Sequence, residues 1–130
     1  MIKYFRDKNV DYNRLIALFN EAGWRDKTED INRLQLMVQN SQIVITAWDD
    51  ELMVGFARCT TDYVFNGQIN NVVVDALYRG KGVGKALINN ILDSNQQVTY
   101  ILRGDIENEG FYKELGFEDS PLTLVYKRKN

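Results

Sequence analysis

The sequence predicts a single α/β domain in which a mixed, mostly antiparallel twisted sheet is flanked by helices. Two observations predict this fold. The hydrophobic period is helical over residues 12–38 and becomes extended over residues 43–74. A glycine-rich loop then joins an apolar β-branched run to another helical pattern, which a short strand follows. Runs joined by short turns pair antiparallel, whereas a strand, helix, strand unit gives a right-handed parallel crossover.

The N-terminal third is expected to form one strand and two helices. Met1–Arg6 has the composition of a strand. Apolar residues recur at helical spacing across Asp11–Ala22, with Asp11 as the N-cap and Gly23 as the C-terminal stop. A second helix is expected over Thr28–Asn40, where Thr28 would provide the cap for an apolar stripe.

Three extended runs follow the two helices. They cover Ile43–Trp48, Leu52–Thr60 and Ile69–Val74 and are rich in β-branched and aromatic residues. Asp49–Glu51 separates the first two runs, and the pair Asn66–Gly67 is a strong hairpin turn signal before the third. The pattern predicts an antiparallel meander.

The C-terminal part is expected to alternate helices with strands. A helix runs from Val83 to about Asp93, and Val98–Leu102 is predicted to be a short buried strand. A short helix over Glu107–Leu115 stops at Gly116. The last run, Leu122–Lys127, is expected to close the sheet.

The segment between the third extended run and the next helix is typical of a phosphate-binding loop. It reads Arg79, Gly80, Lys81, Gly82, Val83, Gly84, Lys85. Alternating glycines allow a tight turn with inward N–H groups, and the helix start adds unpaired N–H groups and a positive dipole end. The three basic side chains add charge around this cradle. A glycine turn that merely caps the helix is the structural alternative, but such a turn needs one glycine rather than three.

Two common nucleotide-binding loops do not match this segment. A Walker loop has four residues between its first glycine and the Gly-Lys pair and then Ser or Thr, whereas only three residues separate Gly80 from Gly84 and Ala86 has no hydroxyl. The dinucleotide fingerprint requires a different glycine spacing and usually follows a chain's opening strand. Neither an NTPase nor a dinucleotide-dependent enzyme is expected.

Composition excludes further classes of function. The 130 residues (1–130) are 45% apolar and 26% charged, with a net charge of −2, which fits one globular domain and disfavours nucleic acid as a partner. The chain has one cysteine, Cys59, and no histidine, so imidazole-based catalysis, an internal disulfide and a metal cofactor are not expected. No run is long and apolar enough to span a membrane, and no secretory leader follows Met1, so the expected location is the cytoplasm.

The loop resembles the acyl-CoA loop of the GNAT N-acetyltransferase superfamily, in which Arg or Gln, two variable residues, Gly, one variable residue and Gly or Ala follow one another. Arg79, Gly82 and Gly84 match that pattern. A second match is Gly110–Phe117, which is similar to the superfamily's Phe-Tyr-x-x-x-Gly-Phe block near the C-terminus. The predicted order of elements agrees with the GNAT fold across nearly the whole chain.

The resemblance implies acetyl-CoA as the cosubstrate and assigns its binding residues. The expected contacts come from the strand before the loop, the loop itself and the later short helix: Val72, Val73, Val74, Arg79, Gly80, Lys81, Gly82, Val83, Gly84, Lys85, Asn108 and Tyr112. A backbone N–H near Val72 or Val73 would polarise the thioester carbonyl. Tyr112 is the expected catalytic residue, because it matches the tyrosine that protonates the departing CoA thiolate. Its structural alternative is an amphipathic core tyrosine.

The implied reaction is direct transfer of an acetyl group from CoA to a primary amine in a ternary complex. A small amine, such as an arylalkylamine with Trp24, Tyr63 and Phe65 around it, is one expectation for the acceptor; a protein lysine or N-terminal amine is another. Many relatives carry a carboxylate base on the strand before the loop, where this chain has Asn70 and Asn71, which cannot accept a proton.

The identity of the general base therefore stays open. A non-catalytic acyl-CoA-binding sensor remains the alternative to an enzyme. Carboxylates acting through water are candidates: Glu29, Asp30, Asp62 and Glu107. The sequence predicts neither the acyl chain length nor whether the protein is a monomer or a homodimer.

Overall fold

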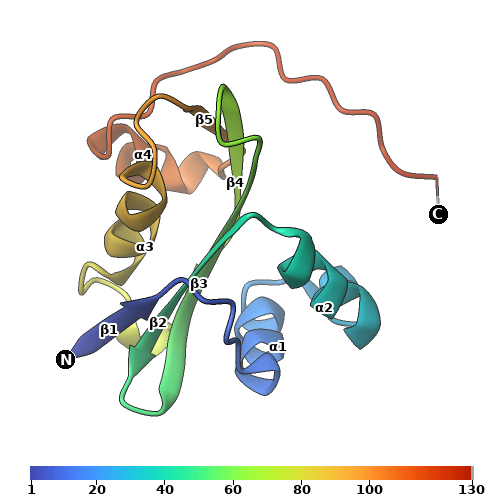
Figure 1. Ribbon diagram of the computed structural model, residues 1–130, viewed down its shortest axis with the longest axis vertical. Helices are drawn as coiled ribbons and strands as arrows, with labels where there is room; N and C mark the ends of the chain where they lie inside the picture. Colours follow the sequence, from blue (N-terminus) through green and yellow to red (C-terminus); the bar gives the residue numbers. More distant parts are fainter. Residues whose placement is uncertain (130) are drawn as a thin grey trace.

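A computed structural model describes residues 1–129 and contains one five-stranded sheet with helices on both faces (Figure 1). The strands lie in the order β1-β2-β3-β4-β5, and every neighbouring pair is antiparallel except β4 and β5, which are parallel. The strands are β1 (Ile2–Phe5), β2 (Ile43–Asp49), β3 (Leu52–Thr61), β4 (Asn66–Val74) and β5 (Thr99–Leu102). The predicted mixed, mostly antiparallel α/β fold is confirmed.

The helices form two layers that cover opposite faces of the sheet (Figure 1). The α-helices are α1 (Tyr12–Glu21), α2 (Ile31–Asn40), α3 (Val83–Leu92) and α4 (Glu109–Glu114), and the 3₁₀ turns are η1 (Arg25–Lys27), η2 (Ala76–Tyr78) and η3 (Ile106–Asn108). Because successive side chains of a strand point to opposite faces, Val44 packs with α1 and α2 while Ile45 packs with α3. No helix among residues 1–129 is long and apolar enough to cross a bilayer.

The helices α1 and α2 each begin after an aspartate whose carboxylate accepts hydrogen bonds from the first free N–H groups of the helix. The Asp11 carboxylate accepts from Arg14 N at the start of α1, as the sequence predicts. Asp30, rather than Thr28, caps α2 by accepting from Asn32 N and Arg33 N, so the predicted start of the second helix is wrong by three residues. The Thr28 hydroxyl instead donates to Asn20 Oδ1, because η1 occupies the preceding residues.

Two predicted features of the strands are wrong. Asn66 and Gly67 lie in β4, not in a turn, and the chain reverses over the preceding four residues. There the Asp62 carboxylate accepts from the N–H groups of Val64, Phe65 and Asn66, which stabilises the turn without glycine. The predicted buried strand Val98–Leu102 is an edge strand, β5, and Ile101 in it is 55% exposed.

The predicted last strand, Leu122–Lys127, does not join the sheet. Residues 118–129 form neither helix nor strand and run outward as an extended arm (Figure 1). An extended segment becomes a strand only when its backbone groups pair with a neighbour, and β5 is the last strand of this sheet. The sequence pattern identified an extended segment but could not supply its partner.

Candidate active site

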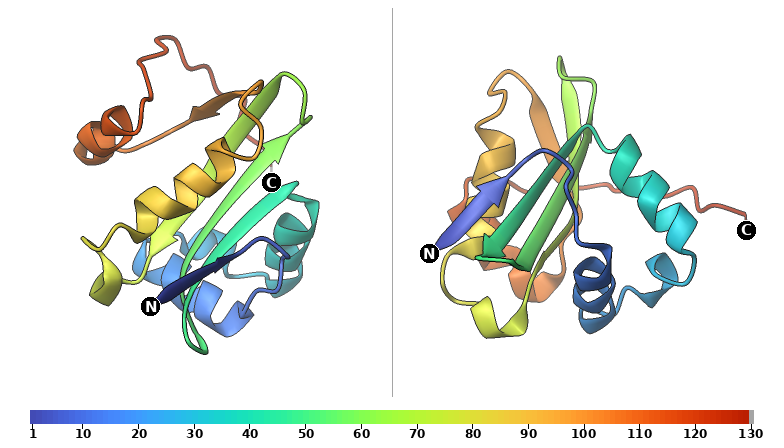
Figure 2. Two further views of the ribbon diagram at one scale, coloured as in Figure 1. Left: turned by 60° about the vertical axis from the view of Figure 1, so that its left-hand side comes forward. Right: turned by 60° about the horizontal axis from the view of Figure 1, so that its bottom comes forward.

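The stretch of β4 before the loop has an edge that β5 leaves open. The parallel pairing runs from Asn66 opposite Thr99 to Ile69 opposite Leu102 and ends there, while β4 continues to Val74. In the left view of Figure 2, β5 accordingly lies apart from the end of β4 that leads into the loop. The backbone of residues 70–74 therefore faces a gap between two diverging strands, where an extended ligand can form strand-like hydrogen bonds.

A β-bulge marks the point at which β4 turns away from β5. Phe56 pairs with Val73 and Arg58 with Asn70, so the residues Asn71 and Val72 together oppose Ala57. Asn71 has a φ of 52°, in the left-handed region that asparagine tolerates better than most residues. The bulge redirects β4 at Asn71 and Val72, where the run of three valines begins.

The three valines alternate between the two faces of the sheet. Val73 is buried in the layer of α1 and α2, whereas Val72 and Val74 pack towards α3. A Cβ added to Gly84 in α3 would lie 3.7 Å from Val74 Cγ2 and 3.5 Å from Phe111 Cζ of α4. The end of β4, the start of α3 and α4 thus meet around Gly84.

The start of α3 is the strongest anion-binding feature of the loop. Gly82 is its N-cap, with a φ of 83°, and no side chain caps the helix. The first backbone bond of the helix runs from Ala86 N to Gly82 O, so the N–H groups of Val83, Gly84 and Lys85 precede the intrahelical ladder. No heavy atom lies within 4 Å of a Cβ placed on Gly82 or on Gly80, so the space in front of these glycines is open to a ligand. Open N–H groups, left-handed glycines and free space are what a pyrophosphate group requires, so the chain fits the cosubstrate that the sequence implies.

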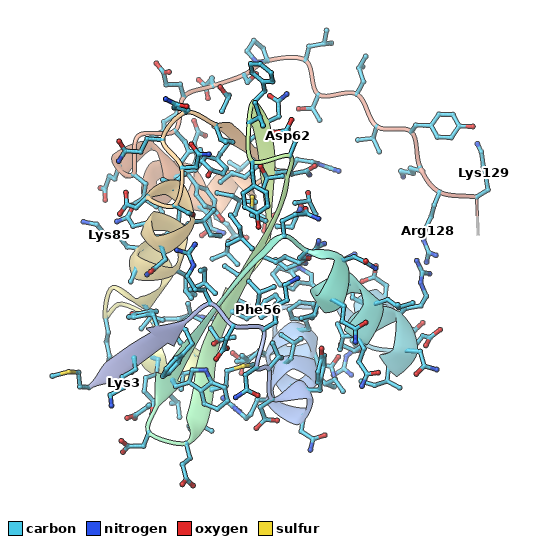
Figure 3. The ribbon with its side chains drawn as sticks, in the orientation of Figure 1. Lys3, Phe56, Asp62, Lys85, Arg128 and Lys129 are labelled. Carbon is cyan, nitrogen blue, oxygen red and sulfur yellow. The ribbon has the colours of Figure 1, made fainter. Side chains whose placement is uncertain are left out.

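The basic residues of the loop differ in what they contact. Arg79 donates from Nε to Val74 O at 3.1 Å and pairs with Glu21 at 3.3 Å, so its guanidinium braces the end of β4 against α1. The Lys81 ammonium lies 5.4 Å from the centre of the Tyr78 ring. Lys85 is exposed on the outer side of α3 (Figure 3). Lys81 and Lys85 can therefore reach a phosphate, whereas Arg79 is held by the protein.

Partly buried and exposed polar contacts fix the loop's first turn, and sequence reasoning did not find them. Asp75 directly follows β4, caps η2 by accepting from Leu77 N and forms a 2.6 Å ion pair with Arg14 of α1. Burial raises the pKa of Asp75, but the Leu77 N–H and Arg14 outweigh it and leave the pKa below its ordinary value. The partner lies 61 residues away along the chain, so no local pattern signals this contact.

Two more contacts complete this support. Glu21, at the end of α1, accepts from Ala76 N at 3.1 Å in addition to its pair with Arg79. The Tyr78 hydroxyl donates to Asp49 of β2 at 2.6 Å. The loop is therefore held at three places by elements outside it, which limits its motion before a ligand binds.

Tyr112 lies on α4 beside the end of β5. Its ring is half-buried and packs edge-on against Phe111 and Phe117, with centroid distances of 5.2 and 6.0 Å. A Cβ on Gly104 would come within 2.8 Å of the Tyr112 ring, so only glycine allows this approach directly after β5. Burial, and then the nearby Asp105, raise the pKa of Tyr112, which keeps the phenol protonated at neutral pH.

Asn108 precedes α4 without capping it. Its backbone N–H donates to Asp105 O, and the residue is exposed. The structure thus brings Tyr112 and Asn108 onto one short segment, as expected, and gives the Asn108 side chain no structural task in capping the helix.

In addition to the gap beside residues 70–74 of β4, a second cleft lies on the α2 side of the sheet, near the bulge. It has a volume of about 380 Å³, and it is lined by Asp26, Lys27, Glu29, Asp30, Arg33, Leu34, Met37, Arg58 and Arg128. Arg58 donates from Nε to Asn71 Oδ1 at 2.8 Å and from Nη1 to Ser41 Oγ at 3.4 Å. Because Asn71 directly precedes the valines, this cleft adjoins the open stretch of β4 from the side of α2.

The candidate bases from the sequence do not come together around one point. Asp62 lies in the β3–β4 turn, where three backbone N–H bonds lower its pKa and make it a weak base (Figure 3). The Asp30 carboxylate caps α2. Glu29 lines the second cleft, and Glu107 is exposed in η3.

Burial raises the pKa of Cys59 to about 11, so this thiol is not a nucleophile at neutral pH.

The three aromatic residues expected around an arylalkylamine are also not assembled. Trp24 packs edge-on against Phe19 at 5.1 Å between α1 and η1. Tyr63 and Phe65 are 51% and 72% exposed in the β3–β4 turn. None of the three lines the second cleft among residues 1–129.

The model of the acetyltransferase (GNAT) family matches residues 9–117. The chain belongs to this family. Its match begins before α1 and ends just after α4, so it includes every element that builds the loop, the open strand and the Tyr112 segment.

Relatives of this GNAT protein come from several lineages. The histone acetyltransferase TAP1 of Glycine max is 32% identical over 127 residues, which is 87% of this chain and 54% of TAP1. The uncharacterized N-acetyltransferase ycf52 of Pyropia yezoensis is 30% identical over 122 residues, 88% of this chain and 69% of the relative. This chain thus spans about half of TAP1 and about two thirds of ycf52.

Solved structures share the fold at lower identity. The GNAT family acetyltransferase SP0256 of Streptococcus pneumoniae superimposes with a TM-score of 0.79 at 22% identity, covering 99% of this chain and 100% of that one. The glucosamine-6-phosphate N-acetyltransferase of Arabidopsis thaliana gives a TM-score of 0.73 at 16% identity over 99% of both chains. These matches establish the GNAT fold.

Proposed function

We propose that this GNAT protein is an acetyl-CoA-dependent N-acetyltransferase that transfers the acetyl group to a primary amine. The observation that carries the proposal is the coincidence of two open hydrogen-bonding surfaces. Beyond Ile69 the β5-facing edge of β4 is open, and it leads into the uncapped start of α3. One ligand with an amide-containing arm and a pyrophosphate would satisfy both surfaces.

In this proposal each group of residues has one task. The N–H groups of Val83, Gly84 and Lys85 bind the pyrophosphate together with the Gly80 and Gly82 turns, and Lys81 adds charge at the rim. The backbone of Val72–Val74 holds the pantetheine arm, and Asn108 binds it from the other side of the gap. Arg79 acts indirectly, because it fixes the end of β4 through Val74 O.

CoA supplies the activated thioester, whose carbonyl carbon accepts the electron pair of the neutral amine while the C–S bond breaks and its electron pair leaves on sulfur. A backbone N–H of Val72 or Val73 would hold the carbonyl oxygen as it gains negative charge. Tyr112 is the group that can give a proton to the leaving thiolate, and its raised pKa keeps that proton available. The proton lost by the amine passes to water or to a carboxylate reached through water.

We infer that the acceptor approaches from the second cleft, because Arg58, which lines this cleft, donates a hydrogen bond to Asn71 of β4. Its lining mixes carboxylates with arginines and, among residues 1–129, contains only two apolar side chains, Leu34 and Met37, which favours a polar amine over an arylalkylamine. TAP1 is named a histone acetyltransferase, so a lysine side chain is a second candidate acceptor. The asparagine at position 71 suits this site, since a carboxylate there would pair with Arg58 and lose basicity.

Thiol release from acetyl-CoA tests the proposal with a panel of polar amines, arylalkylamines and lysine peptides. Amine-dependent release is expected, and it should fall steeply in Tyr112→Phe while CoA binding is kept. A protein that binds CoA but releases no thiol with any amine would instead be an acyl-CoA sensor, the alternative that Asn70 and Asn71 favour. Absence of CoA binding would contradict both functions.

A further inference from the structure

Arg58 of β3 carries a half-buried positive charge into the second cleft, and no carboxylate among residues 1–129 pairs with it. Both of its hydrogen-bond acceptors are neutral: Asn71 Oδ1 lies 2.8 Å from Nε, and Ser41 Oγ lies 3.4 Å from Nη1. The Ser41 hydroxyl donates its own proton to Met37 O, so its oxygen is free to accept from Arg58. Removing a charge from water costs free energy unless an opposite charge accompanies it. The protein leaves that opposite charge to a ligand.

The guanidinium of Arg58 has N–H groups to spare. A guanidinium has five, and the protein accepts from one on Nε and one on Nη1, so the other Nη1 proton and both Nη2 protons have no acceptor among residues 1–129. No side-chain nitrogen or oxygen of these residues is both buried and unpartnered, so Nη2 is reached from the cleft. Planar, divergent N–H groups of this kind bind a carboxylate or a phosphate through two hydrogen bonds.

The carboxylates that line this cleft are placed elsewhere. Asp26 pairs with Lys27 at 3.5 Å. Asp30 Oδ1 accepts from the N–H groups of Asn32 and Arg33 at the start of α2. Glu29 is exposed and forms no ion pair among residues 1–129. The cleft therefore offers an anion the half-buried guanidinium as its strongest partner.

The position of Arg58 assigns this anion to the acceptor rather than to CoA. The cleft lies on the α2 side of the sheet, whereas α3, with its open N–H groups, covers the other side (Figure 1). Asn71, which accepts from Arg58, directly precedes Val72, one of the two residues proposed to hold the thioester carbonyl. Two residues of a strand span about 6.6 Å. An anion at Arg58 and an amine at the thioester therefore fit within one small molecule.

We propose that the acceptor is a small primary amine that carries a carboxylate or a phosphate, and that Arg58 binds this anionic group and positions the amine at the thioester. The proposal rests on the acetyltransferase function proposed above and names its class of substrate. Asn71 completes the site, because its amide accepts from Nε without cancelling the charge of Arg58. A lysine within a basic peptide is a poor match, since its neighbouring cations would meet the guanidinium.

Thiol release with matched amines tests the assignment. Ethanolamine phosphate is compared with ethanolamine, and β-alanine with its amide, so that the first pair tests a phosphate and the second a carboxylate. A nearby anion raises the pKa of an amine and leaves less of it neutral, so a preference for the anionic amine reports binding. For at least one pair, kcat/KM should be at least about tenfold higher with the anionic amine. Arg58→Met should raise KM for that amine at least about tenfold, with a smaller change in kcat, and should leave the neutral amine nearly unaffected.

Two further variants control this experiment. Asn71→Asp places a carboxylate beside Arg58 and should remove the preference for the anionic amine, because the charge of Arg58 is then neutralised within the protein. Arg25→Met is the matched control, since Arg25 is exposed in η1 and does not line the cleft, and it should keep the preference. Calorimetric titration with CoA should give the same affinity for wild type and all three variants.

Titration of ethanolamine phosphate and of β-alanine into the CoA-loaded protein separates this proposal from the acetyltransferase function itself. Binding of either amine that Arg58→Met abolishes, without thiol release from acetyl-CoA, would support the anion site and contradict the enzyme. Four results would overturn the anion site: thiol release with equal kcat/KM within both pairs, a preference that survives Arg58→Met, preferential use of a lysine peptide, or no binding of either anionic amine.

Discussion

Replacement of Gly82 by alanine separates a backbone phosphate cradle from a patch of basic side chains. The Gly82 φ of 83° belongs to the left-handed region, and no heavy atom lies within 4 Å of the added Cβ. The methyl group therefore causes no clash in the free protein, and the cost is backbone strain of about 1–2 kcal/mol. If the pyrophosphate lies in front of Gly82, the same methyl group also occupies the ligand's space, and CoA affinity should fall by at least about tenfold, or 1.4 kcal/mol.

Gly23→Ala is the matched control for this prediction. Gly23 has a φ of 85° and likewise no heavy atom within 4 Å of a Cβ, but it follows α1 on the other face of the sheet. Urea unfolding should show similar destabilisation of the two variants, while calorimetric titration with CoA should show lost affinity only for Gly82→Ala. Lys81→Ala should cost a few-fold in affinity, because an exposed charge contributes about 0–1 kcal/mol. Equal affinities for Gly82→Ala and Gly23→Ala, or a larger loss for Lys81→Ala, would refute the cradle.

Three further predictions follow from the contacts around the site. Gly84→Ala should keep or slightly raise stability, since Gly84 is helical and its Cβ would make ordinary contacts at 3.5 and 3.7 Å, yet it should weaken CoA binding in the same titration. Tyr112→Phe should slow acetyl transfer about 10²-fold, and the wild-type rate should show no loss assignable to Tyr112 between pH 6 and 9, because the raised pKa keeps the phenol protonated there. The assignment would be contradicted if the wild-type rate fell between pH 6 and 9 and the Tyr112→Phe variant showed no such fall. Asp75→Asn should lower the free energy of unfolding by about 1–3 kcal/mol at pH 7. Because the pKa of Asp75 is lower in the folded protein, the difference between wild type and variant should shrink as the pH falls below about 4. A difference that stays constant with pH in urea titrations would rule out the ion pair with Arg14 as its source.

The sequence was sufficient to predict those helices, strands and turns whose structure depends on a local pattern of residues. The period of apolar residues located α1, α3 and the strands β1 to β3 within one or two residues, and alternating glycines marked the loop before α3. Gly82 could be singled out because only a glycine readily takes its backbone angle.

The features that sequence reasoning missed depend on partners distant along the chain. Arg14 and Glu21 support the loop from α1, although nothing in the pattern of that helix distinguishes them from solvated charges. The turn after β3 depends on the carboxylate of Asp62, which is a less familiar signal than the Asn-Gly pair that follows it. The pattern of Leu122–Lys127 is typical of a strand, but a sequence cannot say which sheet edge a strand joins.

Two-dimensional ¹H–¹⁵N NMR with added acetyl-CoA tests the central claim most directly. The proposal that the cosubstrate lies along β4 and ends at the start of α3 predicts shifts concentrated in two groups of amides, those of Val72–Val74 and those of Gly80–Lys85. Saturating acetyl-CoA that moves the amide signals of neither group, or that moves only amide signals of β5 and α4, would contradict the account.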